Sequence, residues 1–181
     1  MTEKAEHLNN QAIRLAADGA YTEAIACFAR AITIDKDNSL LWYNLGLTYR
    51  DAGKLNDAKD ALTKALQIAP DDADVIEELA LILFSLKDFD TAIQICLAGL
   101  QMYPENSHLW NTRGVCFFNK GDFEEASEAF ETAVFLNPYY YDALYNLRDT
   151  YTELGNQTGA AECAKKLSEI KKNGERAPTR Q

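Results

Sequence analysis

Few of the residue types that carry out chemistry stand at spacings that would let them act together. The two histidines, His7 and His108, have neither a nucleophile nor a metal ligand one helical turn away. Glu77 and Glu78 are adjacent, so on a helix they point in different directions and make a poor carboxylate pair. A glycine-rich phosphate loop is also missing from the sequence. The chain is therefore predicted to be no enzyme and to hold no cofactor or metal ion.

The cysteines are the other candidates for chemistry, and they are scattered without a C-x-x-C pair: Cys27, Cys96, Cys116 and Cys163. This pattern is typical of small buried apolar residues in a reducing compartment. The first residues, "MTEKAEHLNN", lack the basic and apolar regions of a signal peptide. No stretch approaches the roughly 18 apolar residues of a membrane span. We therefore expect a cytoplasmic protein.

The charge balance excludes two classes of partner. The chain has 28 acidic and 18 basic residues, a net charge of −10. Such a chain repels phosphate backbones and anionic lipid surfaces, so neither nucleic acid nor a membrane is expected as a partner.

The sequence repeats itself along most of its length. The stretch "WYNLGLTYRDAGKLNDAKDALTKALQIAP" at 42–70 returns as "WNTRGVCFFNKGDFEEASEAFETAVFLNP" at 110–138. Frames of thirty-four residues, 5–38, 39–72, 73–106, 107–140 and 141–174, need no insertion. A period of this length is typical of one supersecondary unit that stacks on copies of itself.

Each frame predicts two amphipathic helices. When the frames are aligned, each equivalent position forms a column. Columns of small residues, where helices can approach closely, alternate with columns of large apolar residues, and neighbouring columns are three, four or seven residues apart. Three columns are Ala12, Gly46, Ala80 and Gly114; Ala24, Ala58, Ala92 and Ala126; and Leu8, Trp42, Ile76, Trp110 and Leu144. Glycine midway through four frames is expected to end the first helix in a left-handed conformation. Lys87 takes that place in 73–106, with an expected strain of about 1–2 kcal/mol.

The order of residues within a frame resembles the tetratricopeptide repeat. It runs, at these intervals, from a tryptophan to Leu-Gly, an aromatic residue, Gly, Ala, an aromatic residue, Ala and Pro. The resemblance covers 5–140 firmly and 141–172 loosely. It implies an all-α fold, a right-handed superhelical α-solenoid of helix-turn-helix hairpins in a single domain, 1–172. Because Arg148 and Leu167 occupy small-residue columns, 141–172 is predicted to be a divergent capping repeat. A disordered tail is predicted at 173–181.

The resemblance further implies that the first helices line a concave groove that binds a peptide or a helix of a partner protein. The predicted groove residues are Asn9, Tyr43, Asn44, Leu47, Asp74, Glu77, Glu78, Leu81, Phe84, His108, Asn111, Val115, Phe118 and Tyr145, with Asn146 and Asp149 also projected inward. Their apolar and aromatic members favour protein binding. The carboxylates, in the most acidic frame, favour a partner with basic residues. The alternative for Leu47, Leu81 and Val115 is packing between adjacent first helices.

Two further interpretations concern the partner. Repeat proteins that bind the acidic C-terminus of cytosolic chaperones have cations where this chain has Asp74 and Glu78, so that ligand is rejected. The alternative function is a structural module that self-associates or belongs to a larger complex, suggested by the aromatic run Tyr139, Tyr140 and Tyr141. An adaptor or chaperone-like module is the preferred hypothesis.

Overall fold

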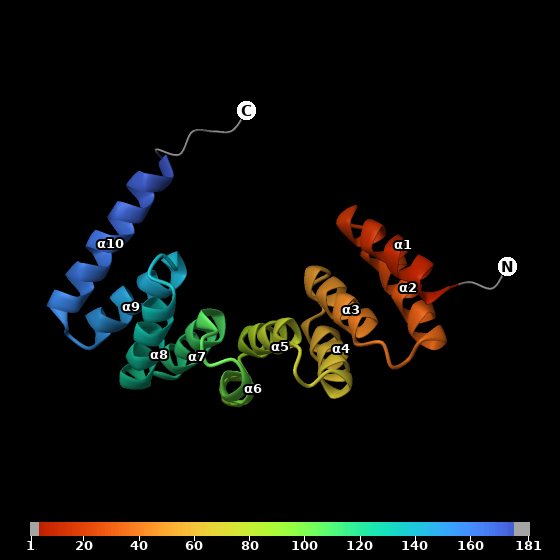
Figure 1. Ribbon diagram of the computed structural model, residues 1–181, viewed down its shortest axis with the longest axis horizontal. Helices are drawn as coiled ribbons and strands as arrows, with labels where there is room; N and C mark the ends of the chain where they lie inside the picture. Colours follow the sequence, from red (N-terminus) through yellow and green to blue (C-terminus); the bar gives the residue numbers. More distant parts are fainter. Residues whose placement is uncertain (1–3, 176–181) are drawn as a thin grey trace. The chain divides into compact units, whose positions relative to one another are not determined.

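The computed structural model describes residues 4–175, with side chains to residue 172. Within these residues the chain forms ten α-helices and no strand (Figure 1). They are α1 (Ala5–Ala17), α2 (Tyr21–Ile34), α3 (Ser39–Asp51), α4 (Leu55–Ile68), α5 (Ala73–Ser85), α6 (Phe89–Met102), α7 (Ser107–Lys120), α8 (Phe123–Leu136), α9 (Tyr141–Glu153) and α10 (Gln157–Glu175). The predicted all-α fold of two helices per repeat is confirmed.

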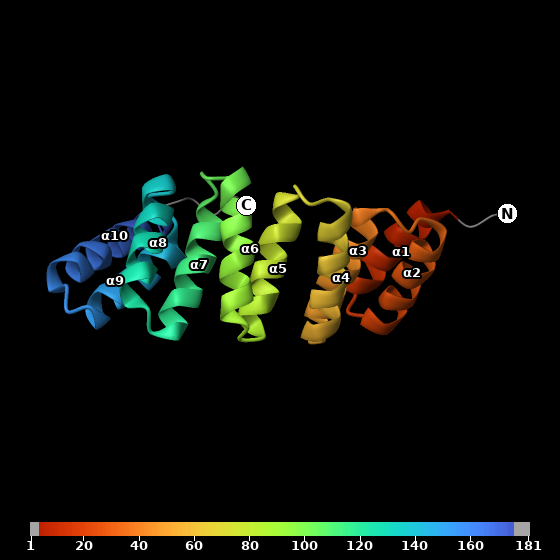
Figure 2. The same cartoon turned by 90° about the horizontal axis from the view of Figure 1, so that it is seen from below.

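The helices fall into two compact units, unit 1 (Met1–Asp88) and unit 2 (Phe89–Gln181). Unit 1 contains the hairpins α1–α2 and α3–α4 followed by α5, and unit 2 contains α6 followed by the hairpins α7–α8 and α9–α10 (Figure 2). The boundary falls between α5 and α6, which the sequence assigns to one repeat.

The last helix is longer than predicted. α10 continues to Glu175, three residues past the boundary expected at 172. The rest of the predicted disordered tail, 176–181, lies outside the described residues.

The turns between paired helices follow one hydrogen-bonding scheme. After α1, Gly19 has φ 77°, and the N–H of Ala20 donates to the Leu15 carbonyl at 2.8 Å. After α5, Lys87 has φ 62°, and the N–H of Asp88 donates to the Leu83 carbonyl at 2.9 Å. The predicted left-handed lysine is therefore confirmed, and it carries the strain that glycine avoids.

The columns of small residues allow the first and second helix of a hairpin to contact each other. A Cβ on Gly46 would lie 2.7 Å from Cγ of Leu62, and one on Gly114 would lie 2.6 Å from Cε1 of Phe130. Leu62 and Phe130 are themselves fully buried, so neither has free space to move into. These contacts fix the hairpins and leave the outward faces of the helices free for other uses.

The two tryptophans, Trp42 and Trp110, are only half-buried, although their column was expected in the core. Their indole N–H groups donate to the carbonyls of Lys36 at 3.0 Å and Pro104 at 2.9 Å, which tie each first helix to the preceding loop. An indole needs such a partner when it packs at an edge of the core.

Candidate partner-binding surface

All fourteen predicted groove residues lie on first helices and none of them is buried. Nine belong to unit 1 and five, from His108 onward, to unit 2. Asp74, Leu81, His108 and Tyr145 are exposed, and the others are half-buried. We call this surface of each unit its first-helix face.

Each unit carries an asparagine pair between neighbouring first helices. In unit 1, Nδ2 of Asn44 on α3 donates to Oδ1 of Asn9 on α1 at 3.0 Å. In unit 2, Nδ2 of Asn146 on α9 donates to Oδ1 of Asn111 on α7, also at 3.0 Å. Each bond uses one donor and one acceptor, and among the described residues no further side-chain hydrogen bond occupies the remaining amide atoms. Both pairs therefore hold a free donor and a free acceptor at the surface.

The next step along unit 1, from α3 to α5, replaces the amide pair with an aromatic and acidic cluster. Burial raises the pKa of Tyr43, and the carboxylates of Asp74 and Glu78 raise it further. Arg50 donates to Oε1 of Glu78 at 2.6 Å and also pairs with Asp51 at 2.9 Å. The Arg50 charge is thus shared between two carboxylates, and Asp74 stays exposed beside Tyr43.

Unit 2 has a hollow on its first-helix face where unit 1 has this cluster. Its volume is about 200 Å³, and its walls are Val115, Phe118, Asn119, Phe130, Asn146 and Asp149. Two predicted groove residues, Val115 and Phe118, therefore line one cavity together with the donor of the amide pair. Three of the lining residues are apolar and three are polar, a mixture that suits a single apolar side chain next to a polypeptide backbone.

Tyr145 and His108, two further predicted groove residues, have separate contacts. The ring of Tyr145 lies under the Arg148 guanidinium at 4.0 Å, and Arg148 pairs with Asp149 at 2.7 Å. Nδ1 of His108 lies 3.1 Å from the hydroxyl of Tyr140, so this histidine contacts the loop before α9. The arginine in a small-residue column is thus accommodated by turning toward the first-helix face.

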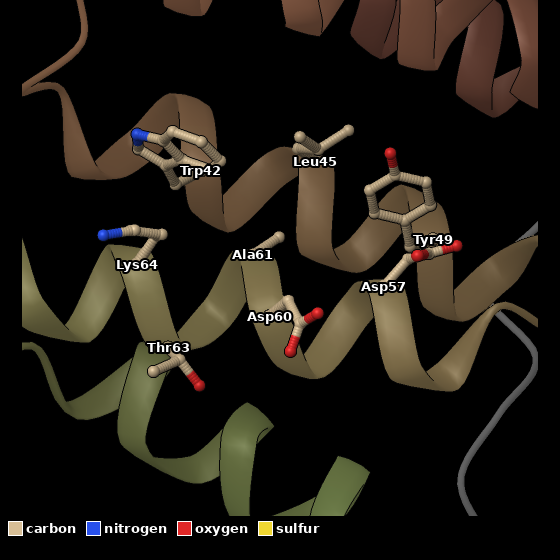
Figure 3. Close-up of a pocket in the computed structure, with 8 residues that line it drawn as sticks. All are labelled: Trp42, Leu45, Tyr49, Asp57, Asp60, Ala61, Thr63 and Lys64. Atoms are coloured by element: carbon tan, nitrogen blue, oxygen red, sulfur yellow. The ribbon is translucent and has the colours of Figure 1, made fainter.

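Another hollow, of about 480 Å³, lies between α3 and α4 in unit 1 (Figure 3). Trp42, Leu45 and Tyr49 follow one another along α3, and α4 contributes Asp57, Asp60, Ala61, Thr63 and Lys64. A neighbouring hollow extends it to α2. The repeat period placed Trp42 in a large apolar column, and only the structure shows that it borders a depression between α3 and α4.

Arg113 is a residue that sequence reasoning missed. It stands where other repeats have the buried leucines Leu45, Leu79 and Leu147. Its guanidinium carbon lies 5.3 Å from the ring centre of Trp110 and 5.2 Å from that of Phe117, and its buried Nε has no hydrogen-bond partner in the described part. The signal was available in the sequence, because "WNTRG" has Arg-Gly where the repeat has Leu-Gly.

Two of the buried thiols, Cys96 and Cys116, are held in the protonated, weakly nucleophilic form. Burial raises the pKa of Cys96 to about 12 and that of Cys116 to about 11, which keeps both protonated near neutral pH. Among residues 4–172 no group of three His, Cys, Asp or Glu side chains is placed to hold a metal ion. None of the described helices is both long enough and apolar enough to cross a bilayer.

Comparisons with known proteins agree with the repeat pattern. Family models described as tetratricopeptide repeat match residues 49–116 and 108–140, and one described as TPR repeat matches residues 14–50. A peroxisomal targeting signal receptor from Candida albicans is 30% identical over 171 residues, 88% of this chain and 28% of the receptor. The chain spans 28% or less of the length of the curated relatives it matches.

Two solved structures show the same fold. MamA from Desulfovibrio magneticus RS-1 has a TM-score of 0.86 at 20% identity, with 96% of this chain and 98% of that chain covered. YrrB, described as a TPR protein with an unusual peptide-binding site, has a TM-score of 0.73 at 24% identity, with 90% and 84% covered. The matches to family models together cover 14–140, and the paired helices continue beyond them. The chain belongs to the tetratricopeptide repeat family and has its all-α solenoid fold.

Proposed function

We propose that this protein is a non-enzymatic adaptor that binds a short peptide, or a helix of a partner protein, on its first-helix faces. The observation that carries the proposal is the hollow in unit 2, which opens at Val115 and Phe118 beside the Asn111–Asn146 pair. An apolar side chain of the partner fills this hollow and loses contact with water there.

The amide pairs supply the polar half of recognition. The free Nδ2 of Asn111 and the free Oδ1 of Asn146 match the C=O and N–H groups that a bound backbone must satisfy. Because the Asn146–Asn111 bond holds both side chains in place, less side-chain entropy is lost when a peptide binds. Asn9 and Asn44 offer the same pair of groups in unit 1.

Unit 1 supports a preference for basic partners. Asp74 is exposed. Burial is the main cause that raises the pKa of the half-buried Tyr43 hydroxyl, and the charges of Asp74 and Glu78 raise it further, in keeping with negative potential at this surface. A lysine or arginine side chain is attracted to such a surface chiefly through its association rate. An acidic chaperone C-terminus would meet like charge at Asp74 and is disfavoured.

The relatives lend support of the same kind. YrrB is described as having a peptide-binding site, and the Candida albicans relative is named as a receptor for a targeting signal. The description of YrrB names a peptide as the ligand, and we extend that class of ligand to this chain. We also propose that the protein acts inside the cytoplasm, where its four thiols stay reduced.

Selection from a displayed peptide library, followed by calorimetry with a selected peptide, tests the proposal. Phe118→Ala is expected to weaken the peptide about tenfold or more, because it removes one wall of the hollow. Asn111→Ala is expected to weaken it by a smaller factor, since it deletes one amide. Phe135→Gln, which removes a phenylalanine from the opposite surface of the same unit, is the matched control and should bind as the wild type does.

The proposal fails if no peptide is selected, or if the selected peptides bind Phe118→Ala and wild type equally. The selected sequences also test the charge preference. Enrichment of Asp and Glu instead of Lys and Arg would contradict the role given to Asp74.

A further inference from the structure

The end of α8 and the loop after it carry an apolar patch that no other repeat has. Phe135 is 82% exposed and Tyr139 is 76% exposed, whereas no other large apolar side chain in the described part exceeds 54%. The internal repeat gives the comparison. The places equivalent to Phe135 hold Thr33, Gln67, Gln101 and Glu169, and those equivalent to Tyr139 hold Asp37, Asp71 and Glu105. Exposed positions that are polar or acidic elsewhere have thus become aromatic in this repeat.

The patch borders a hollow between α8 and the hairpin α9–α10. This hollow, of about 500 Å³, has walls from α8, α9 and α10, including Phe135, Pro138, Tyr151 and Lys166. A smaller hollow of about 270 Å³ adjoins it through Pro138 and Lys166 and is lined by Tyr139, Glu169 and Ile170. We call Phe135, Pro138, Tyr139, Lys166, Glu169 and Ile170 the α8–α10 patch.

The first of these hollows repeats, 102 residues later, the depression that unit 1 has beside α3. Leu144, Leu147 and Tyr151 stand where Trp42, Leu45 and Tyr49 stand in unit 1. In unit 1 the second-helix position beside it is Thr33, and the loop position is Asp37. The framework is therefore common to both units, and only the aromatic border is special to unit 2. A border of exposed rings next to a depression is a mark of a protein contact.

We propose that the α8–α10 patch is the contact through which two copies of this chain form a dimer. Charge argues for a second copy as the occupant. The chain carries −10 in total, but residues 157–172 of α10 have four lysines and two glutamates. The loop has lost its acid, because tyrosine replaces the Asp or Glu found at 37, 71 and 105. Two acidic molecules can therefore approach each other here with the least repulsion.

The charged side chains of the patch, Lys166 and Glu169, are complementary to the same two side chains of a second copy. Lys166 and Glu169 are three residues apart on α10, so they lie on one side of the helix. In a dimer with twofold symmetry, two α10 helices that cross antiparallel bring Lys166 of each copy against Glu169 of the other. Glu131 and Glu162 also line this hollow and keep their negative charges, and Glu131 accepts a hydrogen bond from the Tyr151 hydroxyl at 2.8 Å. The rings then pack at the centre, and the ion pairs lie at the rim.

Analytical ultracentrifugation of the full chain between about 5 and 200 µM tests the dimer, a range suited to a small interface. The wild type is expected to shift from monomer to dimer across this range. Phe135→Gln, which adds no charge and installs a side chain used by other repeats, should weaken the dimer about tenfold. Phe135→Gln with Tyr139→Asp should remain monomeric throughout. Because both substitutions copy exposed positions of other repeats, helical content and thermal midpoint should not change.

Charge exchange tests the twofold arrangement. Lys166→Glu alone should weaken the dimer, and Lys166→Glu with Glu169→Lys should restore it. Leu97→Glu, on the exposed side of α6, and Phe118→Ala, on the first-helix face, are controls that should dimerise as the wild type does. Phe118→Ala also separates this inference from the proposed peptide binding, which depends on the other face.

A wild type that stays monomeric at 200 µM overturns the proposal. So does a dimer whose dissociation constant is the same with and without the rings at 135 and 139. A monomeric chain that instead captures another protein through Phe135 and Tyr139 would assign the patch to a different partner and would also overturn it. Failure of the double charge exchange to restore the dimer would exclude the twofold contact through α10.

Discussion

Unit 1 and unit 2 are built from one repeat, yet they present different surfaces. Both have an asparagine pair of 3.0 Å between first helices, at positions that differ by 102 residues. Unit 1 then continues with Tyr43 and its carboxylates, whereas unit 2 has the hollow at Phe118. On their second helices, unit 1 has Thr33 where unit 2 has the exposed Phe135.

The comparison separates positions whose residue type is restricted by packing from positions whose residue type can vary. Ala12, Ala80 and the alanines of the second column are fully buried, because helices there approach too closely for a larger group. First-helix and loop positions meet no such limit. Each unit can therefore acquire its own binding chemistry without loss of the fold.

The units can be followed separately in experiments. Each contains one of the two tryptophans, Trp42 in unit 1 and Trp110 in unit 2. Replacing either one with Phe leaves the fluorescence of the other as a reporter of its own unit during urea unfolding. With these two reporters the stability of each unit can be measured on its own.

The largest expected difference concerns the small column. Gly114→Ala is expected to lower the free energy of unfolding reported by Trp110 by about 2–3 kcal/mol. The new Cβ would meet three ring atoms of Phe130 at 2.6–2.9 Å, and a ring cannot bend away. Gly46→Ala should cost unit 1 only about 1 kcal/mol, since a single atom, Cγ of Leu62 at 2.7 Å, would lie closer than 3.0 Å to the new Cβ. Equal losses at both reporters would show that the units unfold as one and would break the comparison.

A smaller difference is expected in alkali. Burial raises the pKa of Cys96 to about 12 and of Cys116 to about 11, both in unit 2. Above about pH 9 the unfolded chain releases these protons while the folded chain keeps them, so the free energy of unfolding falls as pH rises. Between pH 8 and pH 9.5 the Trp110 reporter should lose about 2 kcal/mol more than the Trp42 reporter.

The double variant Cys96→Ala with Cys116→Ala is the control for this pH dependence. It lowers stability at every pH because it removes packed sulfur atoms, but most of the extra alkaline loss in unit 2 should disappear. Burial also raises the pKa of Tyr151 and of Cys163 in unit 2, and these groups account for the remainder. A slope of undiminished size without the two thiols would assign the pH dependence to other groups.

The smallest expected effect lies at the end of unit 1. Lys87→Gly should raise the free energy of unfolding reported by Trp42 by about 1 kcal/mol, because glycine adopts φ 62° without a Cβ clash. Gly53→Lys, at the equivalent turn with φ 73°, should lower it by a similar amount. If the lysine costs nothing, Lys87→Gly will leave the urea midpoint unchanged or lower it.

Periodicity was enough to predict the helices, the left-handed turns and the small columns. Gly114 and Lys87 were both assigned their roles from position alone, because local backbone geometry and close approach recur with the period. The half-buried tryptophans, the length of α10 and the stack of Arg113 on Trp110 were not predicted. They depend on how much neighbouring loops and rings cover each side chain, which the period does not encode.

The candidate surface divides in the same way. The family pattern placed Val115, Phe118 and Asn111 on the inward side, but it could not say that the first two share a cavity. It treated Asn9 and Asn44 as separate ligands, whereas they bond to each other and leave only half of each amide free.

The sequence by itself determined the repeat, the all-α fold and the absence of buried charge from most core columns, since these follow from spacing and residue size. The tertiary structure decided the rest: the division between α5 and α6, the hollow at Phe118 and the exposure of Phe135 and Tyr139. The physical reason is that burial and cavities are properties of surfaces from several helices at once. A thirty-four-residue period specifies each helix and its nearest contact, but not the space that remains between them.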